Sequence, residues 1–233
     1  MARSVYVETL IRADIDELWR RTQRPDFHQR WDLRFTEIDY LPRAPGEPQR
    51  FRYTLRPLPW LAIAGTGITA RERHGANRSR TSALRFSSQD PISLIRSGSG
   101  FWRYIPTDDG IRFVTGYGYH PGWGGWGVVI DLAFRPIMGW ATAWSFDRLR
   151  LWLESGRTPE RSLRQALVEL GVRVTVTVAA LAVMSPALAI AVAATAILLP
   201  PLPNTPAARR CLRRPPDRRV ATAPATLTEL ERP

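Results

Sequence analysis

The amino-acid sequence predicts an α+β protein in which a curved, antiparallel, seven-stranded sheet surrounds a long C-terminal helix. A hydrophobic transmembrane or re-entrant helical tail is expected to follow. Seven short stretches rich in β-branched and aromatic residues are separated by turn signals. A long apolar stretch, 128–153, follows the last of them and suits a helix. Beyond it, the 26 residues Val174–Leu199 carry no charge at all.

The chain opens with a predicted strand and two short helices. Ser4–Ile11 is rich in β-branched residues and alternates as a strand does. Asp14 is the expected N-cap of the first helix, with Glu17 three residues later as its capping-box partner. Pro25 suits the first turn of a second helix, because its fixed φ is preorganised for that position.

Six further strands are expected before the long helix. The connections between them are short, which favours an antiparallel meander over βαβ units. The sequence places these strands near 33–40, 49–55, 60–73, 78–87, 92–104 and 111–119.

A cavity is expected between the long helix and the concave face of the sheet. A strongly curved sheet cannot pack flat against one helix along its whole length, so a space suited to hydrophobic molecules should remain. Gly122–Gly127 is expected to be a flexible hinge at the mouth of this cavity. The same segment matches the dinucleotide motif G-x-G-x-x-G, but it follows the sheet instead of opening a βαβ unit, and its two tryptophans would crowd a pyrophosphate. No cofactor is therefore expected.

At this point the chain resembles the START/Bet v 1-like superfamily, also called SRPBCC or polyketide cyclase/dehydrase-like. The resemblance covers 4–154 and rests on the element order, on Val5–Ile11, on Asp16-Glu17-Leu18-Trp19 and on Trp31–Phe35. It implies a helix-grip fold. Members bind lipids, sterols, polyketides or hormones, and some cyclise or hydrolyse what they bind. The superfamily has no universal catalytic residues, so the resemblance assigns none here.

The candidate cavity residues are mostly aromatic. On the last strand, the side chains of Phe113, Tyr117 and Tyr119 share one face that should point toward the long helix, where phenol hydroxyls could orient a polar ligand group. An inward Arg96 would need an anionic partner, whereas an outward Arg96 would be solvated. The full set of candidates is Trp31, Tyr53, Arg96, Trp102, Tyr104, Phe113, Tyr117, Tyr119, His120, Phe134, Met138 and Trp144.

No catalytic or metal-binding constellation is legible in the sequence. The histidines, His28, His74 and His120, lack Cys, His or carboxylate partners at ligand spacing, so no metal site is expected. His120 is either a surface residue or an acid/base group at the cavity mouth. Asp32 and Arg34 are expected to form an ion pair that fixes the turn into the second strand. No Ser-His-Asp or Cys-His arrangement is seen.

The sequence divides into a domain and a tail. We expect a helix-grip ligand-cavity domain at 1–156, an amphipathic linker helix at 157–173, a membrane segment at 174–203 and a basic, Pro/Ala-rich disordered tail at 204–233. As one helix the uncharged run would be about 39 Å long, enough to cross a hydrocarbon core of about 30 Å. This length favours a single span, while Ser185-Pro186 near its middle keeps a re-entrant hairpin open.

Charge and topology suggest a membrane-associated protein with its folded domain on the cytoplasmic side. The net charge of +12 comes from arginine, because the chain contains no lysine. No signal peptide is recognisable at the start. The residues expected at the membrane surface are Arg209, Arg210, Arg213 and Arg214, which the positive-inside rule places in the cytoplasm. Among them lies Cys211, either a bystander or a lipidated juxtamembrane thiol.

Three functions fit these features. The first is membrane-tethered binding or transfer of a hydrophobic small molecule, lipid-like or polyketide-like, with membrane lipids as a second partner. The second is an aromatase/cyclase-type enzyme acting on a polyketide-like substrate. The third is a basic-surface scaffold or nucleic-acid-binding module, although the arginines lie beside a long apolar run and no nucleic acid is expected. The sequence gives no oligomeric state.

Overall fold

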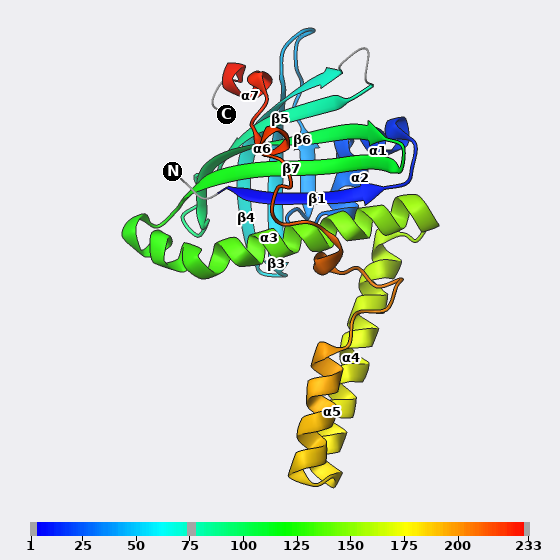
Figure 1. Ribbon diagram of the computed structural model, residues 1–233. Coiled ribbons are helices and arrows are strands. Elements are labelled where there is room, and N and C mark those ends of the chain that lie inside the picture. The colour runs from blue at the N-terminus through cyan, green and yellow to red at the C-terminus, as the bar shows by residue number, and fades with distance from the viewer. Residues whose placement is uncertain (1–3, 74–77, 231–233) are drawn as a thin grey trace.

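The computed structural model of the chain describes residues 4–73 and 78–230 and has a curved sheet crossed by one long helix, with a helical hairpin projecting from one end (Figure 1). The predicted α+β architecture is confirmed, and all seven strands pair antiparallel in the order β1-β7-β6-β5-β4-β3-β2. The strands are β1 Val5–Ile11, β2 Glu37–Tyr40, β3 Gln49–Leu58, β4 Leu61–Arg73, β5 Arg80–Ser87, β6 Ile95–Thr107 and β7 Gly110–Pro121. The helices are α1 Ile15–Gln23, α2 Pro25–Trp31, α3 Gly124–Ser155, α4 Pro159–Val183, α5 Pro186–Leu198, α6 Arg218–Ala221 and α7 Ala225–Glu229, with a 3-10 turn η1 Ala208–Arg210.

Helix α1 begins where its capping residue predicts. The Asp14 carboxylate accepts hydrogen bonds from the backbone amides of Asp16 and Glu17, at 2.8 and 3.0 Å. Pro25 opens α2, as its fixed φ favours. Both helices therefore start for local reasons, before any contact with the sheet is considered.

Two strands are shorter than the sequence predicts, because side-chain oxygens accept hydrogen bonds from the backbone amides at their expected starts. The stretch before β2 is not a strand, since Leu33 donates its amide to Ser145 Oγ at 3.0 Å. Before β6, the Asp90 carboxylate holds the amide of Ile92 in a turn at 3.1 Å, and the strand begins three residues later. Such local side-chain bonds compete with sheet pairing.

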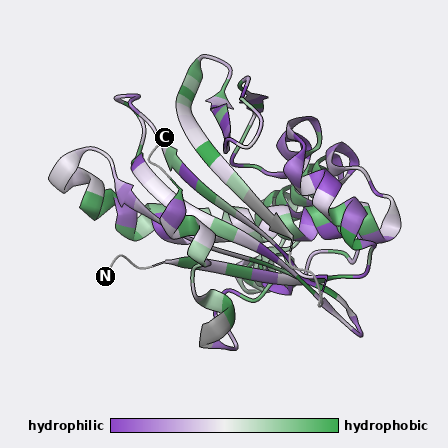
Figure 2. Cartoon of the chain, turned by 90° about the horizontal axis from the view of Figure 1, so that it is seen from above, coloured by the Kyte–Doolittle hydropathy of each residue, from purple (hydrophilic) through white to green (hydrophobic). Residues whose placement is uncertain are grey.

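Hydrophilic and hydrophobic residues alternate in bands along the strands (Figure 2). On the concave face of β7, Phe113 stacks on Phe146 of α3 with ring centroids 4.4 Å apart, and Tyr117 bonds to Thr142 of α3 at 2.9 Å. The predicted aromatic face of the last strand therefore does point toward the long helix.

Helix α3 has two different halves. From Thr142 to Trp152 nearly every residue is buried, and this half packs with Trp31, Trp102 and Phe113 to form the main core. The first half, from Gly124, is largely exposed. Because the core fills the space under one half of α3 only, the space under the other half is left for a cavity.

The glycine-rich segment is mostly helical, which corrects the expectation of a loop throughout 122–127. Trp123 has a left-handed conformation, with φ 60°, and α3 starts immediately after it. Gly127 lies in the first turn and packs directly against the backbone of Gly122. Small residues are needed here for close packing, so the hinge is at most the turn at 122–123.

Helices α4 and α5 form an antiparallel hairpin rather than one long span (Figure 1). Ser185 is extended because the proline ring that follows it disfavours the helical region, and Pro186 then opens α5. The expected boundary between linker helix and membrane segment, at 173/174, falls inside the continuous helix α4. A single crossing by the whole uncharged run, which its length favoured, is therefore wrong.

Residues 204–230 pack against the domain, so the expected disorder of 204–233 is wrong for the part that the structure describes. This C-terminal segment returns from the hairpin and runs along the outer face of the sheet (Figure 1). Glu8 and Leu212 exchange both backbone hydrogen bonds at 2.9 Å. Leu227 and Leu230 are buried against Ile68 and Ala83. The composition of this segment suggested disorder, yet its few apolar residues are spaced so that they pack against the sheet.

Candidate functional site

A cavity of about 790 Å³ lies between the concave face of the sheet and the helices. Its walls come from the end of α1, from α2, from strands β2 to β7, from α3 and from the first turns of α4. Most of the lining is apolar, and the principal apolar side chains are Ile38, Phe51, Leu55, Ile63, Leu84, Phe86, Trp102, Phe134, Ile137, Met138 and Leu163.

A buried polar cluster lines one part of this cavity. Asp32 accepts two hydrogen bonds from Arg34, at 2.9 and 2.6 Å, which confirms the ion pair that the sequence predicts. The other neighbour of the same carboxylate is His28 Nε2, at 3.1 Å. Arg34 also lies over the Tyr117 ring, with its guanidinium carbon 5.4 Å from the centroid. The cluster is a chain of mutually satisfied groups, not a set of free ones.

The charges within the cluster explain how it can be buried. Burial alone would raise the pKa of Asp32, but the charge and hydrogen bonds of Arg34 outweigh it and hold that pKa below its ordinary value. Burial lowers the pKa of His28, against the opposing pull of Asp32, and keeps the imidazole neutral near pH 7. Burial likewise raises the pKa of Tyr117. At neutral pH the cluster therefore holds one ion pair, a neutral imidazole and a neutral phenol.

Arg148 also lines the cavity, from the buried half of α3. Its Nε donates to the carbonyl oxygen of Pro159 at 2.9 Å, and its guanidinium lies 5.6 Å from the Trp144 ring centroid. Two more arginines, Arg30 and Arg56, contribute to the lining near the surface. Arg30 is paired with Glu160 at 2.8 Å. The site is thus apolar over most of its wall, with arginines gathered at its polar part.

Five of the predicted cavity residues line this space, namely Tyr53, Trp102, Tyr117, Phe134 and Met138. Four others belong to the solid core, namely Trp31, Tyr104, Phe113 and Trp144. The hydroxyl of Tyr104, for instance, is occupied by Thr22 at 2.7 Å and Gln23 at 2.9 Å.

The remaining three candidates lie away from the cavity lining. Tyr119 donates its hydroxyl to Asp131 at 2.6 Å. Arg96 is exposed and reaches the carbonyl of Ser88, which fits the solvated alternative. His120 is exposed at the end of β7, and His74 lies outside the described residues. Alternation along β7 correctly predicted the face on which its aromatic residues lie, but it did not show which of them reach the cavity.

Sequence reasoning missed the roles of His28 and Arg148. The i, i+4 spacing of His28 and Asp32 could have indicated their contact, because residues four apart lie on one helix face. Arg148 carries no such signal, because it lies in the charged stretch Asp147–Arg150 and nothing in the sequence separates it from Arg150. Within 4–73 and 78–230, no three His, Cys, Asp or Glu side chains gather closely enough to hold a metal ion.

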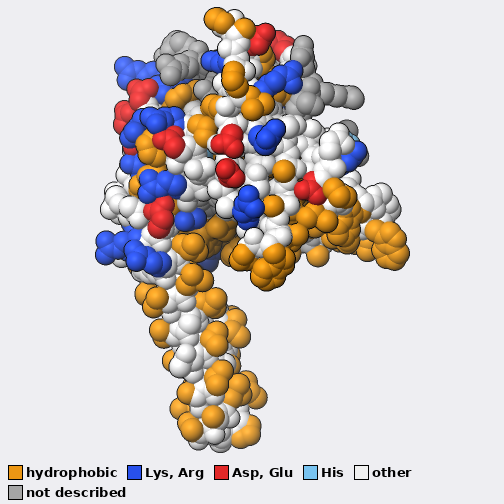
Figure 3. Space-filling model, turned by 180° about the vertical axis from the view of Figure 1, so that it is seen from behind, with side chains coloured by type: hydrophobic (Ala, Val, Ile, Leu, Met, Phe, Trp, Pro, Cys, Tyr) orange, Lys and Arg blue, Asp and Glu red, His pale blue; other side chains and the backbone are white. Residues whose placement is uncertain are grey.

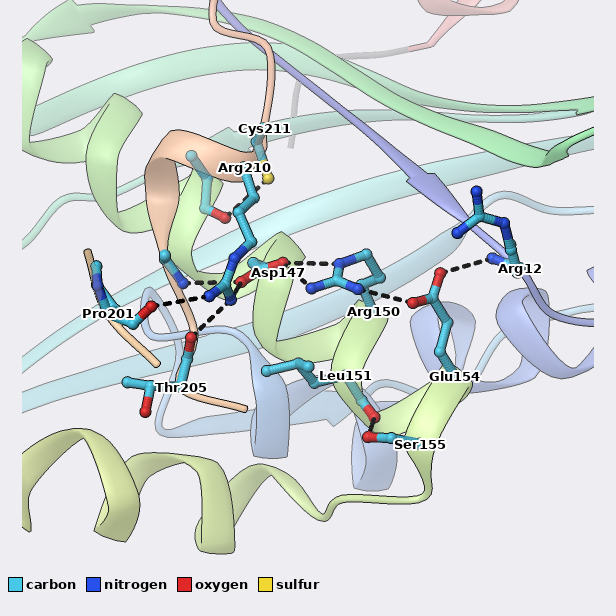
Figure 4. Close-up of polar contacts among 12 residues, drawn as sticks. Arg12, Asp147, Arg150, Leu151, Glu154, Ser155, Pro201, Thr205, Arg210 and Cys211 are labelled. Atoms are coloured by element: carbon cyan, nitrogen blue, oxygen red, sulfur yellow. Dashed lines mark hydrogen bonds and ion pairs between the residues drawn. The ribbon is translucent and has the colours of Figure 1, made fainter. Parts of the chain in front are cut away.

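The base of the hairpin is tied to the domain by Asp147 (Figure 4). Its buried carboxylate accepts from the Ala207 amide at 2.8 Å, from Arg210 at 2.9 Å and from Arg150 at 2.7 Å. Cys211 is buried beside this network and donates its thiol to the carbonyl oxygen of Ala143 at 3.2 Å. Burial raises the pKa of the Cys211 thiol to about 12. These contacts favour the bystander interpretation of Cys211 over a lipidated thiol.

The four arginines expected at the membrane surface do not form one patch. Arg210 is engaged with Asp147, so its position is set by the protein. Arg213 and Arg214 lie on the segment that crosses the outer face of the sheet, beside β1, β6 and β7. Arg209 is exposed at η1, near the base of the hairpin.

Comparison with known proteins gives one relative and several structural neighbours. The chain is 46% identical over 168 residues to the uncharacterized membrane protein YndG of Bacillus subtilis (strain 168). That match covers 71% of this chain but only 63% of the relative's own length. No family model matches the sequence.

Solved structures match the domain at low sequence identity. A fragment of the STAR-related lipid transfer protein from Xanthomonas axonopodis superposes with a TM-score of 0.51 at 16% identity, covering 65% of this chain and 86% of that one. The di-domain ARO/CYC StfQ from the steffimycin biosynthetic pathway superposes with a TM-score of 0.50 at 13% identity, covering 65% of this chain and 50% of that one. The fold is the helix grip that the sequence predicts. At these identities the likeness of the helix-grip domain concerns fold alone.

Proposed function

We propose that this chain is a membrane-anchored protein that binds or transfers a hydrophobic small molecule, lipid-like or polyketide-like, in its helix-grip cavity. The observation that carries this proposal is the cavity itself. Its volume of about 790 Å³ and its mainly apolar lining suit a small-molecule site, which typically measures about 300–1,000 Å³. The names of the two structural neighbours, a lipid transfer protein and an aromatase/cyclase, are consistent with this use of the fold.

The hairpin supports membrane anchoring. Helix α4 is long and apolar enough to cross a membrane by length and composition, and little of it is buried. Its uncharged part, Val174–Val183, is about 15 Å long, and the 13 residues of α5 make about 20 Å. The uncharged part of each arm is shorter than a hydrocarbon core of about 30 Å. A re-entrant hairpin that dips into one leaflet fits these lengths.

Arg173 marks the level at which the hairpin would leave the hydrocarbon. It donates to the carbonyl oxygens of Leu199 and Pro200, at 2.8 and 3.0 Å, and pairs with Glu169 at 2.6 Å. These bonds satisfy carbonyls at the end of α5 that the helix itself leaves unpaired. A hairpin returns the chain to its starting side, so the domain and Arg209 would share the cytoplasmic face, in agreement with the positive-inside rule.

Several large apolar residues of the domain are exposed, and one of them lines the cavity. Trp60 in the β3–β4 turn is 80% exposed, and Trp126 at the start of α3 is 78% exposed. Ile137 lines the cavity and is itself exposed. Hydrophobic side chains cover the hairpin and also gather on the side of the domain toward which the hairpin extends (Figure 3). An exposed apolar surface beside a membrane anchor would place the cavity mouth at the bilayer, the source of apolar ligands.

The test is ligand capture by the full chain in detergent or nanodiscs. Binding of the neutral fluorophore Nile red is followed by fluorescence, and copurified molecules are identified by mass spectrometry. Ala141 lines the cavity from α3, so Ala141→Trp should fill it and weaken Nile red binding at least tenfold. Ala44→Trp, in the exposed β2–β3 loop, is the matched control.

Saturable Nile red binding that only Ala141→Trp removes would support the proposal. A chain that binds neither Nile red nor any copurified molecule would refute it. Equal binding by the wild type and Ala141→Trp would show that the dye occupies another surface, and it too would count against a cavity ligand.

An enzyme of the cyclase type is the second candidate, favoured by the cluster around His28. A neutral imidazole held by a carboxylate is suited to accept a proton from an enolisable carbon. Turnover of a linear poly-β-keto substrate that is lost in His28→Gln, while Nile red binding persists, would identify this activity. Binding without turnover would leave the carrier function.

The nucleic-acid alternative receives less support from the surface. On the face seen in Figure 3, arginines are interspersed with acidic side chains rather than aligned in one basic stripe. A nucleic-acid surface would need such a stripe together with exposed aromatics.

A further inference from the structure

Arg148 is buried without a counterion. Only 5% of the residue is exposed, and its hydrogen bond within the described chain is the one from Nε to the Pro159 carbonyl. Across 4–73 and 78–230, its terminal nitrogens make no hydrogen bond and no carboxylate lies within 4 Å of them. Burial lowers the pKa of Arg148 to about 10, which still leaves the guanidinium charged at neutral pH.

The two carboxylates that attract Arg148 are already engaged. Asp32 binds Arg34 and His28, and Glu160 binds Arg30. Neither can turn to Arg148 without abandoning a partner at less than 3.2 Å. Both carboxylate acceptors near Arg148 are therefore committed to other partners.

Two partly buried arginines of this fold do have acidic partners. Arg150 is paired with both Asp147 and Glu154 at 2.7 Å, and Arg112 is paired with Glu8 at 2.6 Å. A buried charge without a partner costs several kcal/mol, which is why such pairing is the rule. Arg148 departs from the pattern at the point where its helix faces the cavity.

The cavity lining as a whole has an excess of positive charge. It contains the arginines Arg30, Arg34, Arg56 and Arg148 but a single carboxylate, Asp32. Since Arg34 already neutralises Asp32, the lining offers no acid to balance Arg148. A purely apolar ligand would leave this charge buried and uncompensated.

We propose that the cavity ligand is an amphiphile with an anionic head group, a carboxylate or a phosphate, which Arg148 binds through its terminal nitrogens while the apolar part lies along the concave face. This inference rests on the proposed binding function and adds the charge of the ligand. A guanidinium presents two parallel donors that match the two oxygens of either group. A neutral alcohol of equal length could accept a hydrogen bond from the guanidinium, but it brings no negative charge to neutralise it.

The experiment compares three sixteen-carbon ligands that differ in head group. Hexadecanoate, hexadecyl phosphate and hexadecanol are each titrated as competitors against Nile red bound to the full chain, at concentrations below their aggregation limits. In the wild type, at least one anionic ligand should bind ten times or more as tightly as hexadecanol, and the two anionic arms separate a carboxylate from a phosphate ligand. Arg148→Met should remove most of this preference, so that its affinities for the anionic ligands and for hexadecanol become similar.

Arg96→Met is the matched control, because Arg96 is exposed and lies outside the cavity lining. Thermal unfolding of the ligand-free variants gives an independent measurement. Replacing an uncompensated buried charge should leave the Tm of Arg148→Met unchanged or higher, whereas loss of a structural anchor to Pro159 would lower it.

Failure of this inference is distinguishable from failure of the proposed function. Nile red binding with equal affinity for all three ligands would retain the cavity function and reject the anionic head group. An anionic preference that survives in Arg148→Met would reject the role of Arg148. Absence of any binding, Nile red included, would reject both.

Discussion

At the scale of single residues, Asp32 decides whether Arg34 can stay buried. Its carboxylate is fully enclosed and accepts hydrogen bonds from Arg34 and from the amide of that same residue. Removing one member of a buried ion pair leaves the other charge without compensation, which is more costly than removing both. Loss of one member of this pair should therefore lower the free energy of unfolding, an effect not expected for a surface ion pair.

Asp32→Asn should destabilise the full chain by about 3–5 kcal/mol, because Arg34 would remain charged and buried. The double variant Asp32→Asn/Arg34→Met should be less destabilised than the single variant. Chemical denaturation in detergent, followed by near-UV circular dichroism, measures both. A single variant as stable as the wild type would show that Arg34 finds solvent or another partner.

The same carboxylate makes the stability of the fold depend on pH. The pKa of Asp32 is lower in the folded chain than the ordinary value of about 3.9, so the unfolded chain takes up its proton first as the pH falls. The stabilisation is complete above about pH 5 and is lost progressively below it. The slope of unfolding free energy against pH between about 5 and 3 should accordingly be steeper in the wild type than in Asp32→Asn.

Sequence reasoning found some of these residues and missed others for a clear physical reason. The Asp32–Arg34 pair is local, two residues apart, so it could be expected from the chain alone. Arg148 lines the cavity, and the two acids near it are already paired with other arginines. Both facts depend on tertiary contacts, which the spacing of residues in the sequence does not reveal. Which aromatics line a cavity and which fill the core depends in the same way on tertiary distance.

At the scale of elements, the start of α3 depends on the absence of a side chain at Gly127. A Cβ there would lie 1.7 Å from the carbonyl oxygen of Gly122, which is backbone and cannot move aside cheaply. Gly125, two residues earlier in the same helix, has nothing within 4 Å of such a Cβ. The two glycines form a natural pair of test and control.

Gly127→Ala should destabilise the chain by about 1–3 kcal/mol, the usual cost of forcing extra volume into a packed site. Gly125→Ala should be neutral or stabilising by up to about 1 kcal/mol, because alanine favours a helix over glycine. Thermal and denaturant unfolding measure the two variants in parallel. Equal effects would mean that the contact between Gly122 and Gly127 does not hold the turn.

The hairpin shows what hydropathy can and cannot predict about an element. The length of the uncharged run predicts a membrane-seeking segment, which stays a prediction, but length says nothing about a reversal of direction. The deciding signal was local, the restriction that Pro186 places on Ser185. Most strands and the first two helices were predictable for the opposite reason, because their caps, turns and alternation are themselves local.

Val183 lies at the tip of the hairpin and is 80% exposed. Val183→Asp should weaken partition of the full chain into liposomes several-fold, because a carboxylate resists transfer into hydrocarbon, while the fold of the distant domain stays unchanged. Leu41→Asp is the matched control, since Leu41 is 37% exposed in the β2–β3 loop at the opposite end of the domain (Figure 1). Flotation of the two variants with vesicles measures the difference, and equal flotation would argue against insertion of the tip.

At the scale of the whole molecule, the domain is closed by residues that follow the hairpin. Asp147 of α3 holds Ala207 and Arg210, and just beyond them Cys211 enters the core (Figure 4). Low exposure and a raised thiol pKa should both make Cys211 slow to react. Its reactivity is thus a reporter of whether the C-terminal segment is docked.

In the folded wild type, alkylation of Cys211 by iodoacetamide at pH 8 should be at least a hundredfold slower than in the denatured chain. Asp147→Ala should accelerate it, because the segment loses two of its bonds to α3. Asp109→Ala, an exposed acidic residue in the β6–β7 turn, should leave the rate unchanged. Mass spectrometry of the intact chain gives these rates, and rapid labelling of the wild type would refute the docked position.

The path of the chain also fixes an order of events during synthesis. Ribosomes deliver the sheet and α3 first, then the two arms of the hairpin, and only afterwards the stretch that carries Cys211 and Leu227. The niches for those two side chains stay open until translation has passed the apolar arms. Under the proposed membrane anchoring, the hairpin of a nascent chain would meet the bilayer before the domain is complete, and membrane delivery would precede the final step of folding.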